Sequence, residues 1–192
     1  MRKIAITGSI ACGKTTVLRH IAKRFPVFNC DEVIRVLYHQ SDTLCEIKKK
    51  FNMEIFSKEE LVRIITSNKT ALKSLEAILY PKLHKMMQEF ERKTRRFSNV
   101  AFFEVPLLFE KHLEKNYDGA IVLHSTKWKR KKNFLKRGGS EAMFRFLNSN
   151  QWSDAKKSSI VKKTLMEKKD FTLISALGRN IAYKKLHECT RI

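Results

Sequence analysis

The stretch RKIAITGSIACGKTTVLRHIAKRF, residues 2–25, decides the fold. The apolar run at 4–6 predicts a buried strand, and apolar residues at helical spacing in 17–25 predict one face of a helix. Between them, Gly8 and Gly13-Lys14-Thr15 have the spacing G-x-x-x-x-G-K-[ST] of a phosphate-binding loop. Because the motif lies between the strand and the helix that it requires, we expect a nucleotide phosphate at this turn.

The predicted loop would bind phosphate mainly through its backbone. Glycine permits conformations that are closed to other residues, and the first N–H groups of the following helix have no partner within the helix. Lys14 would add a cation for the β- and γ-phosphates, and the Thr15 hydroxyl would coordinate Mg²⁺ brought with ATP. The predicted ATP-binding residues are Gly8, Ser9, Ile10, Ala11, Cys12, Gly13, Lys14, Thr15 and Thr16.

Composition limits the class of protein. The chain has 192 residues, of which 43% are hydrophobic, enough for one sizeable core and too few for two large domains. It has no run of about 18 apolar residues and no signal-peptide pattern at its N-terminus, so we expect a cytoplasmic protein with no membrane partner. The 4 cysteines are scattered without a C-x-x-C pair, which favours reduced thiols.

The net charge is strongly positive, +21, from 40 Lys and Arg against 19 Asp and Glu. The basic residues cluster at 92–96, 127–132 and 162–169, without the aromatic interleaving of an RNA-binding motif. We interpret these clusters as solvated helix faces rather than as a nucleic-acid site, which remains the alternative. The sequence leaves the oligomeric state open.

Strand and helix patterns alternate along the chain. Apolar runs typical of further strands occur at 27–30, 99–105, 117–124 and 170–175. Helical patterns occur at 31–39, 41–51, 57–68, 69–80, 82–93 after Pro81, a basic segment after residue 124, and 178–188. This alternation predicts an α/β fold with a parallel, doubly wound sheet in three layers and ligands at the carboxyl ends of the strands.

Two carboxylates follow predicted strands at the same edge of the sheet as the loop. These are Asp31 and Glu104. Phosphoryl transfer needs mainly positioning and charge stabilisation, with a base or orienting group at the attacking oxygen, and Asp31 fits that need. Arg35 lies four residues later, on the same face of a helix opened by Asp31, where it could bind a substrate anion or form a plain surface ion pair.

Four motifs occur in the order found in one kinase family. TGSIACGKT at 7–15, NCDEVIR at 29–35, EVPLLFE at 104–110 and NQWSDAKK at 150–157 make the chain resemble the dephospho-coenzyme A kinases over essentially its whole length. The run PLLFE beside a P-loop is the most specific of them. The chain departs from the family pattern at Asn29, where an Asp is usual, at Glu104, where an Asp is usual, and at Asn133, where a lid Arg is usual.

The resemblance implies an enzyme that transfers a phosphoryl group from ATP to the ribose 3′-hydroxyl of dephospho-CoA, the last step of coenzyme A biosynthesis. Asp31, Lys14 and Arg137 would then be the catalytic residues. The acceptor-binding residues would be Asp31, Arg35, Glu104, Pro106, Leu107 and Leu108. A lid would carry Arg137, Arg145 and Lys157.

The resemblance also implies a domain division. It gives a P-loop core at 1–41, 97–136 and 158–192, a helical acceptor insertion of the CoA-binding type at 42–96, and a helical lid at 137–157 whose closure would exclude water. Three alternatives stay open: another P-loop kinase, a nucleic-acid-associated nucleotide-binding protein, and a regulatory nucleotide-binding module without catalysis.

Overall fold

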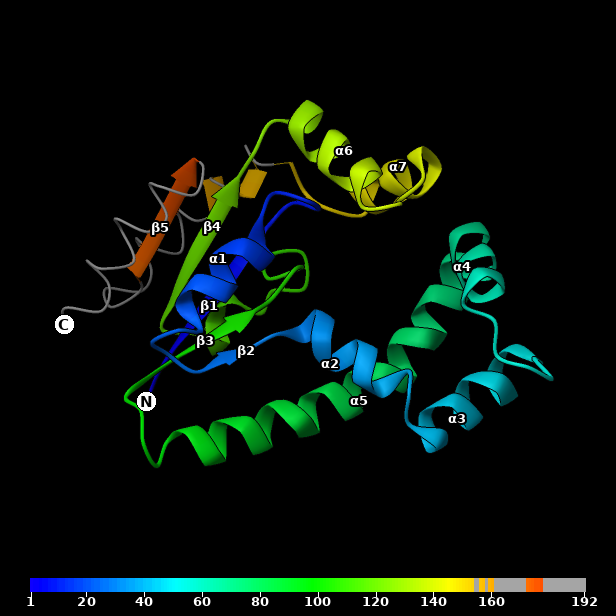
Figure 1. The fold of residues 1–192 in the computed structure, drawn as a ribbon, viewed down its shortest axis with the longest axis horizontal. Helices are drawn as coiled ribbons and strands as arrows, with labels where there is room; N and C mark the ends of the chain where they lie inside the picture. The colour runs from blue at the N-terminus through cyan, green and yellow to red at the C-terminus, as the bar shows by residue number, and fades with distance from the viewer. Residues whose placement is uncertain (154–155, 158, 161–171, 178–192) are drawn as a thin grey trace. The chain divides into compact units, whose positions relative to one another are not determined.

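The computed structural model describes residues 1–153, 156–157, 159–160 and 172–177, and within them it contains one five-stranded sheet (Figure 1). Its strands are β1 (Arg2–Gly8), β2 (Val27–Phe28), β3 (Val100–Glu104), β4 (Gly119–His124) and β5 (Thr172–Leu177). Their order is β2-β3-β1-β4-β5, and every neighbouring pair is parallel. The predicted parallel α/β fold is confirmed.

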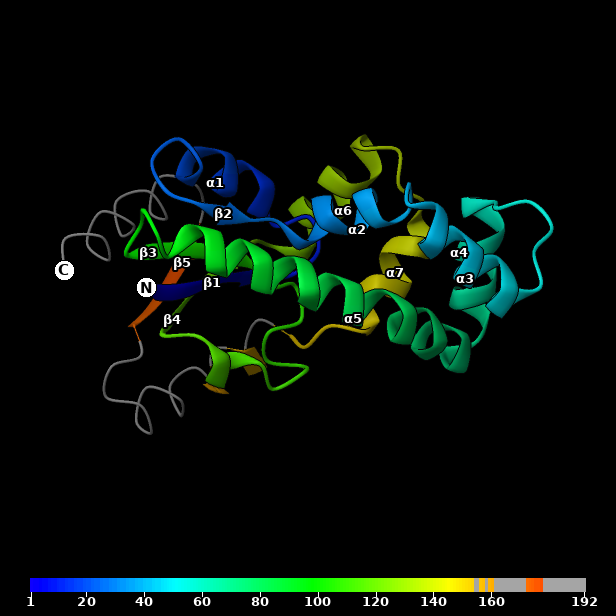
Figure 2. The same cartoon turned by 90° about the horizontal axis from the view of Figure 1, so that it is seen from below.

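The central place of β1 explains why the N-terminal stretch is so apolar. A strand of a parallel sheet that is covered on both faces reads as a continuous hydrophobic run, and residues 4–8 of β1 are all buried. Helix α1 (Lys14–Ile21) lies on one side of the sheet (Figure 2). The buried members of this core are Ile4, Ile6, Val17, Leu18, Ile21, Phe102, Ile121 and Leu123. The turn between β1 and α1 therefore begins at the carboxyl end of the central strand.

After β4 the chain forms a pair of helices, α6 (Lys127–Lys136) and α7 (Glu141–Ser149). Each begins at a capping hydroxyl, because the Thr126 side chain accepts a hydrogen bond from the Lys129 amide and the Ser140 side chain accepts one from the Met143 amide. A 3₁₀ turn, η1 (Glu114–Asn116), precedes β4. The predicted closing helix at 178–188 lies outside the described residues.

The chain divides into two compact units, unit 1 with Met1–Phe28 and Thr94–Ile192, and unit 2 with Asn29–Lys93. Unit 2 is helical, with α2 (Cys30–Leu37), α3 (Ser41–Phe51), α4 (Lys58–Ser67) and most of α5 (Lys69–Thr94). Its buried core contains Leu37, Ile47, Met53, Leu61, Leu75 and Leu79. Among the described residues, no helix combines the length with the apolar character that crossing a membrane demands.

The prediction of two helices separated by Pro81 was wrong, because α5 continues through this proline. A proline inside a helix removes one backbone hydrogen bond and crowds the carbonyl of the preceding turn, so it kinks a helix without having to end it. Figure 1 shows α5 changing direction part-way along. Leu79 before the proline and Leu83 after it both pack in the unit 2 core, which favours a continuous helix.

The second strand is shorter than predicted. It ends at Phe28 because the Asn29 side chain accepts a hydrogen bond from the Glu32 amide at 3.2 Å and so caps α2. The signal was present in the sequence, since Asn followed three residues later by Glu is a typical helix start. The fifth strand, predicted at 170–175, is observed at Thr172–Leu177.

Candidate active site

The P-loop is a tight turn whose conformation is set by three residues of positive φ. Gly8 has φ 151°, Ala11 has φ 57° and Gly13 has φ 106°. Within the turn, the Cys12 amide donates to the Ser9 carbonyl at 3.2 Å, and the Thr16 amide donates to the Gly13 carbonyl at 3.1 Å. The sequence prediction placed this turn correctly and identified its glycines, but it did not single out Ala11.

Gly8 is required both by its backbone angle and by its neighbour. A Cβ atom at this position would lie 2.5 Å from the carbonyl oxygen of Leu123 and 2.8 Å from Sγ of Cys12. Leu123 is the β4 residue paired with Gly8 in the sheet. The loop can therefore leave the sheet here only through glycine.

The side chain of Lys14 lies over this turn. Its ammonium group donates to the carbonyl of Gly8 at 3.0 Å and to that of Ser9 at 3.4 Å. No acidic residue occupies the first turn of α1, so the positive end of the helix dipole is not offset there by a carboxylate. Thr15, the second residue of α1, is half-buried. The turn thus combines backbone donors, a cation and a hydroxyl, which is the chemistry that a nucleotide phosphate needs.

Two side chains from other parts of unit 1 clamp the P-loop backbone. The Ile10 amide donates to Oε1 of Gln151 at 2.7 Å. Nδ2 of Asn133, on α6, donates to the carbonyl of Ala11 at 3.3 Å. Neither side chain is among the predicted site residues, although Gln151 lies in the NQWSDAKK motif.

The helix pair α6–α7 is held together by a buried arginine. Arg130 is only 7% exposed; its Nη1 donates to Oδ1 of Asn148 at 2.8 Å, and its Nε donates to the Ser125 carbonyl at 3.2 Å. Phe134 and Phe144 add a ring contact with centroids 5.8 Å apart. The prediction that the 127–132 cluster forms a solvated helix face therefore fails at Arg130.

Arg137 and Arg145, predicted as lid cations, are both exposed. Arg137 is the C-cap of α6, directly before Gly138 at φ 82°, and the amides of Gly138 and Gly139 donate to the carbonyls of Leu135 and Phe134. This is the glycine-ended helix terminus of the Schellman type, so the backbone of Arg137 is fixed while its side chain faces solvent.

Arg145 lies on α7 with an acidic neighbour. The pKa of Glu141 is lowered because Lys131 donates a hydrogen bond to its carboxylate, and the charges of Lys131 and then Arg145 lower it further. The Lys131–Glu141 ion pair measures 2.7 Å. Like the side chain of Arg137, that of Arg145 is exposed.

The PLLFE motif follows β3 in unit 1. Glu104, the last residue of β3, is 1% exposed and pairs in register with Ile6 of β1. The hydroxyl of Thr7 donates to the Pro106 carbonyl at 3.4 Å. Leu108 is fully buried, whereas Leu107 is half-buried. The structure thus places Glu104 and Pro106, two of the predicted acceptor residues, beside the strand that ends in the P-loop.

Lys157, the third predicted lid cation, is fully buried, and its ammonium group lies 3.0 Å from Oε1 of Glu110, whose side chain is 6% exposed. The same carboxylate oxygen accepts a hydrogen bond from the Trp152 amide at 2.8 Å. The role of Lys157 toward a nucleotide stays a prediction, and its observed contact is a brace between two segments of unit 1.

Asp31 and Arg35 belong to unit 2, where both lie exposed on α2. Asp31 is in the first turn of the helix and Arg35 in its last turn. Within the described part of the chain, no hydrogen bond or ion pair is recorded for either side chain. Asn29, which stands where a carboxylate is usual in the resembled family, caps this helix.

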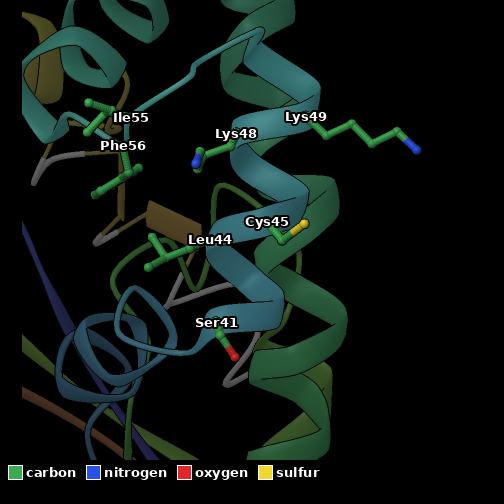
Figure 3. Close-up of a pocket in the computed structure, with 7 residues that line it drawn as sticks. All are labelled: Ser41, Leu44, Cys45, Lys48, Lys49, Ile55 and Phe56. Carbon is green, nitrogen blue, oxygen red and sulfur yellow. The ribbon is translucent and has the colours of Figure 1, made fainter.

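Unit 2 also has a cavity of about 700 Å³ beside α3, shown in Figure 3. It is lined by Ser41, Leu44, Cys45, Lys48, Lys49, Ile55 and Phe56. Figure 3 shows Leu44 and Lys48 on the side of α3 that faces Ile55 and Phe56, and Lys49 directed away. The lining combines the apolar side chains of Leu44, Ile55 and Phe56 with two lysines, which suits a ligand with an apolar part and a negative charge.

The model of the dephospho-CoA kinase family matches residues 2–171. The chain belongs to this family. A dephospho-CoA kinase of Bartonella henselae is 31% identical over 169 residues, covering 82% of this chain and 84% of the relative. One of Listeria innocua is 33% identical over 174 residues, covering 83% and 86%.

Solved structures of low identity confirm the fold of this dephospho-CoA kinase family member. A structure from Thermus thermophilus has a TM-score of 0.75 at 22% identity and covers 99% of this chain and 96% of its own. A dephospho-CoA kinase from Campylobacter jejuni has a TM-score of 0.62 at 22% identity and covers 100% and 98%.

Proposed function

We propose that this protein transfers the γ-phosphoryl group of ATP to the ribose 3′-hydroxyl of dephospho-CoA, giving coenzyme A and ADP in the last step of coenzyme A biosynthesis. The observation that carries the proposal is the family match over residues 2–171, which includes the P-loop and the PLLFE motif. The geometry of the P-loop supports it, since the turn provides backbone donors and Lys14 for the phosphates of ATP. We place the reaction in the cytoplasm.

In this proposal the P-loop holds the donor. Residues 8–16 bind the phosphates of ATP, and the ammonium group of Lys14, which bonds the Gly8 carbonyl in this structure, turns to the β- and γ-phosphates. The Thr15 hydroxyl fits Mg²⁺, because this ion prefers oxygen ligands and is usually held by one or two protein groups together with substrate phosphates. When bound, Mg²⁺ would neutralise part of the phosphate charge.

Helix α2 supplies the acceptor chemistry. Asp31 would orient the 3′-hydroxyl and accept its proton, and Arg35 would bind the acceptor as a charged donor. Both side chains are exposed on α2. The helical segment 42–96 would bind the rest of dephospho-CoA, and the cavity at Leu44 and Lys48 offers apolar walls and a positive charge for a chain that carries phosphate.

The lid would complete the site. Arg137 would stabilise the charge on the transferring phosphoryl group, with Arg145 and Lys157 behind it, and closure of residues 137–157 would exclude water that could otherwise accept the phosphoryl group. The fixed C-cap backbone of Arg137 supports this role, because it limits where the exposed guanidinium can reach.

The test follows phosphate transfer by mass. The purified protein is incubated with Mg·ATP and dephospho-CoA, and with a deoxynucleoside, shikimate or a 5′-hydroxyl oligonucleotide in parallel reactions. We expect phosphate on dephospho-CoA alone. Transfer to the oligonucleotide instead would overturn the proposal and would favour the nucleic-acid alternative suggested by the charge of +21.

Two variants of α2 test the catalytic role of Asp31. Asp31→Asn should lower transfer by about 10²- to 10⁴-fold, the usual contribution of a general base, with little change in ATP affinity. Glu32→Gln is the matched control, because Glu32 is an exposed acid of the same helix turn. Equal losses in the two variants, or a parallel loss of ATP binding in Asp31→Asn, would show that Asp31 is structural.

A further inference from the structure

The strained part of the P-loop is held from outside the loop. Ala11 has φ 57°, which costs a residue with a Cβ free energy and persists only where the surroundings hold it. Gln151 binds the amide of Ile10, just before Ala11, and Asn133 binds the carbonyl of Ala11 itself. The backbone on both sides of this φ angle is therefore clamped.

Gln151 is itself held in place by a buried carboxylate. The next residue, Trp152, donates its amide to Oε1 of Glu110 at 2.8 Å, and the buried ammonium group of Lys157 lies 3.0 Å from the same oxygen. A backbone N–H can be satisfied only by an acceptor, so loss of the carboxylate oxygen would leave the Trp152 amide without this partner. Glu110 thus fixes the chain one residue away from Gln151.

We infer that Glu110 is a positioning residue for phosphoryl transfer, which through the Trp152 amide holds Gln151 on the Ile10 amide and so keeps the P-loop in its strained conformation. The inference rests on the proposed function. Glu110 ends the PLLFE motif, whose residues Pro106, Leu107 and Leu108 are assigned to the acceptor by the family resemblance. The contacts accordingly join the acceptor motif to the donor loop within unit 1.

A shift of the P-loop matters for rate because the loop backbone positions the phosphoryl group that is transferred. Transfer depends on alignment of the attacking oxygen with the phosphorus atom, and small displacements lower the rate even where binding survives. The expected signature is therefore a fall in kcat with little change in the KM for dephospho-CoA.

Four variants separate the carboxylate oxygen from the ion pair. The first double variant combines Lys157→Met with Glu110→Gln and is called the Glu110→Gln pair. It removes both charges and keeps an oxygen that can accept from Trp152. The second double variant combines Lys157→Met with Glu110→Leu and is called the Glu110→Leu pair. It removes both charges and also the oxygen that accepts from Trp152. Gln151→Leu removes the acceptor for the Ile10 amide directly, and Gln151→Leu added to the Glu110→Leu pair gives the triple variant.

Two readouts are measured on each full-length variant: kcat and KM for dephospho-CoA with Mg·ATP, and hydrogen exchange of the Ile10 amide without ligands. Gln151→Leu and the Glu110→Leu pair should each lower kcat by about tenfold and speed Ile10 exchange by about tenfold, the range of one lost hydrogen bond. The Glu110→Gln pair should keep Ile10 exchange within about twofold of the wild type. Because it carries the same Lys157→Met change, it is the reference from which the tenfold loss of kcat in the Glu110→Leu pair is counted. The triple variant should match the Glu110→Leu pair in both readouts, because Glu110 acts through Gln151.

Three results would overturn the inference: unchanged Ile10 exchange in the Glu110→Leu pair, an equal loss of kcat in the Glu110→Gln pair, or multiplied losses in the triple variant. Failure of the proposed function looks different. If the wild-type protein does not phosphorylate dephospho-CoA, Glu110 has no role in that transfer. Exchange of the Ile10 amide would still show whether Glu110 holds Gln151 on the loop.

Discussion

The P-loop of unit 1 and helix α2 of unit 2 carry their parts of the proposed chemistry in opposite ways. The P-loop presents backbone groups, and its shape is set by the close approach of Gly8 to Leu123 and by the clamp at Ile10. Helix α2 presents the exposed side chains of Asp31 and Arg35, and its start is fixed by the cap at Asn29. The loop should therefore be sensitive to backbone changes, and α2 to changes of individual side chains.

Gly8→Ala is the change of largest expected effect. The new Cβ would lie 2.5 Å from the carbonyl oxygen of Leu123, so either β4 or the loop must move. We expect a loss of about 2–4 kcal/mol in the free energy of unfolding, as for overpacking combined with backbone strain, and loss of measurable ATP binding. Urea unfolding and calorimetric titration with ATP measure the two effects.

Gly13→Ala is the matched control for Gly8→Ala. Gly13 also has a positive φ, 106°, but a Cβ there meets no atom within 4 Å. This variant carries the strain without the clash and should lose only about 1–2 kcal/mol. Equal losses in the two variants would contradict the view that the contact with Leu123 fixes the loop.

Asn29→Ala tests the other side of the comparison. It removes the side-chain cap of α2 and should cost about 1 kcal/mol in urea unfolding. Phosphoryl transfer should fall as well, because the Asp31 position depends on the first turn of the helix. Asn29→Asp is the control, since Asp caps a helix as well as Asn does. Loss of stability in Asn29→Asp equal to that in Asn29→Ala would mean that the cap does not hold α2.

Much of unit 1 could be predicted from the sequence because local pattern and fold agree there. The apolar run at β1 and the spacing from Gly8 to Thr15 each pointed to the same strand, turn and helix. The clamp could not be predicted, because Gln151 and Ile10 are 141 positions apart, and a polar side chain carries no periodic signal of its partner. The burial of Lys157 was missed for the same reason, since lysine is seldom buried unless paired.

Local signals were present in unit 2 but were partly misread. The capping pattern from Asn29 to Glu32 sets the end of β2 at Phe28, whereas the predicted strand continues to residue 30. Pro81 predicts a break in the helix, although the apolar residues around it continue at helical spacing and pack in one core. Propensity alone was overruled there by packing.

Ala11→Gly tests the strain in the P-loop with a smaller effect. Glycine adopts the observed φ of 57° without a Cβ penalty, so the variant should raise the free energy of unfolding by about 1 kcal/mol. Thermal unfolding would show this as a rise of about 2–4 °C in Tm. Cys12→Gly is the control, because Cys12 has no positive φ and glycine there should destabilise the loop. No gain in Ala11→Gly would mean that the clamp does not hold a strained residue.

Asp42→Asn should give the smallest effect, since it acts on an exposed ion pair of unit 2 rather than on backbone. The Lys82 ammonium group lies 2.6 Å from Oδ2 of Asp42 and 3.0 Å from Oε1 of Glu46. The hydrogen bond from Lys82 lowers the pKa of Asp42, and the hydrogen bonds from Lys82 to Asp42 and then Glu46 raise the pKa of Lys82. The ion pair is therefore fully formed between the ordinary carboxylate and lysine pKa values, near 4 and about 10.4, and the two shifts extend it beyond both values.

Because its pKa is lower in the folded state, Asp42 adds stability that is present above its unfolded value and is lost as the pH falls through the folded one. Urea unfolding should then show Asp42→Asn slightly less stable than the wild type at pH 7, and the gap should close in acid and shrink in high salt. Asp42 also lies in the first turn of α3, where its charge interacts with the helix dipole. Lys82→Met and the double variant Asp42→Asn with Lys82→Met separate the contribution of the ion pair from that of the dipole. If the difference in stability between Asp42→Asn and the wild type stayed unchanged in acid, Asp42 would stabilise unit 2 by something other than its charge. Unit 2 would then resemble unit 1, where the P-loop is held through its backbone.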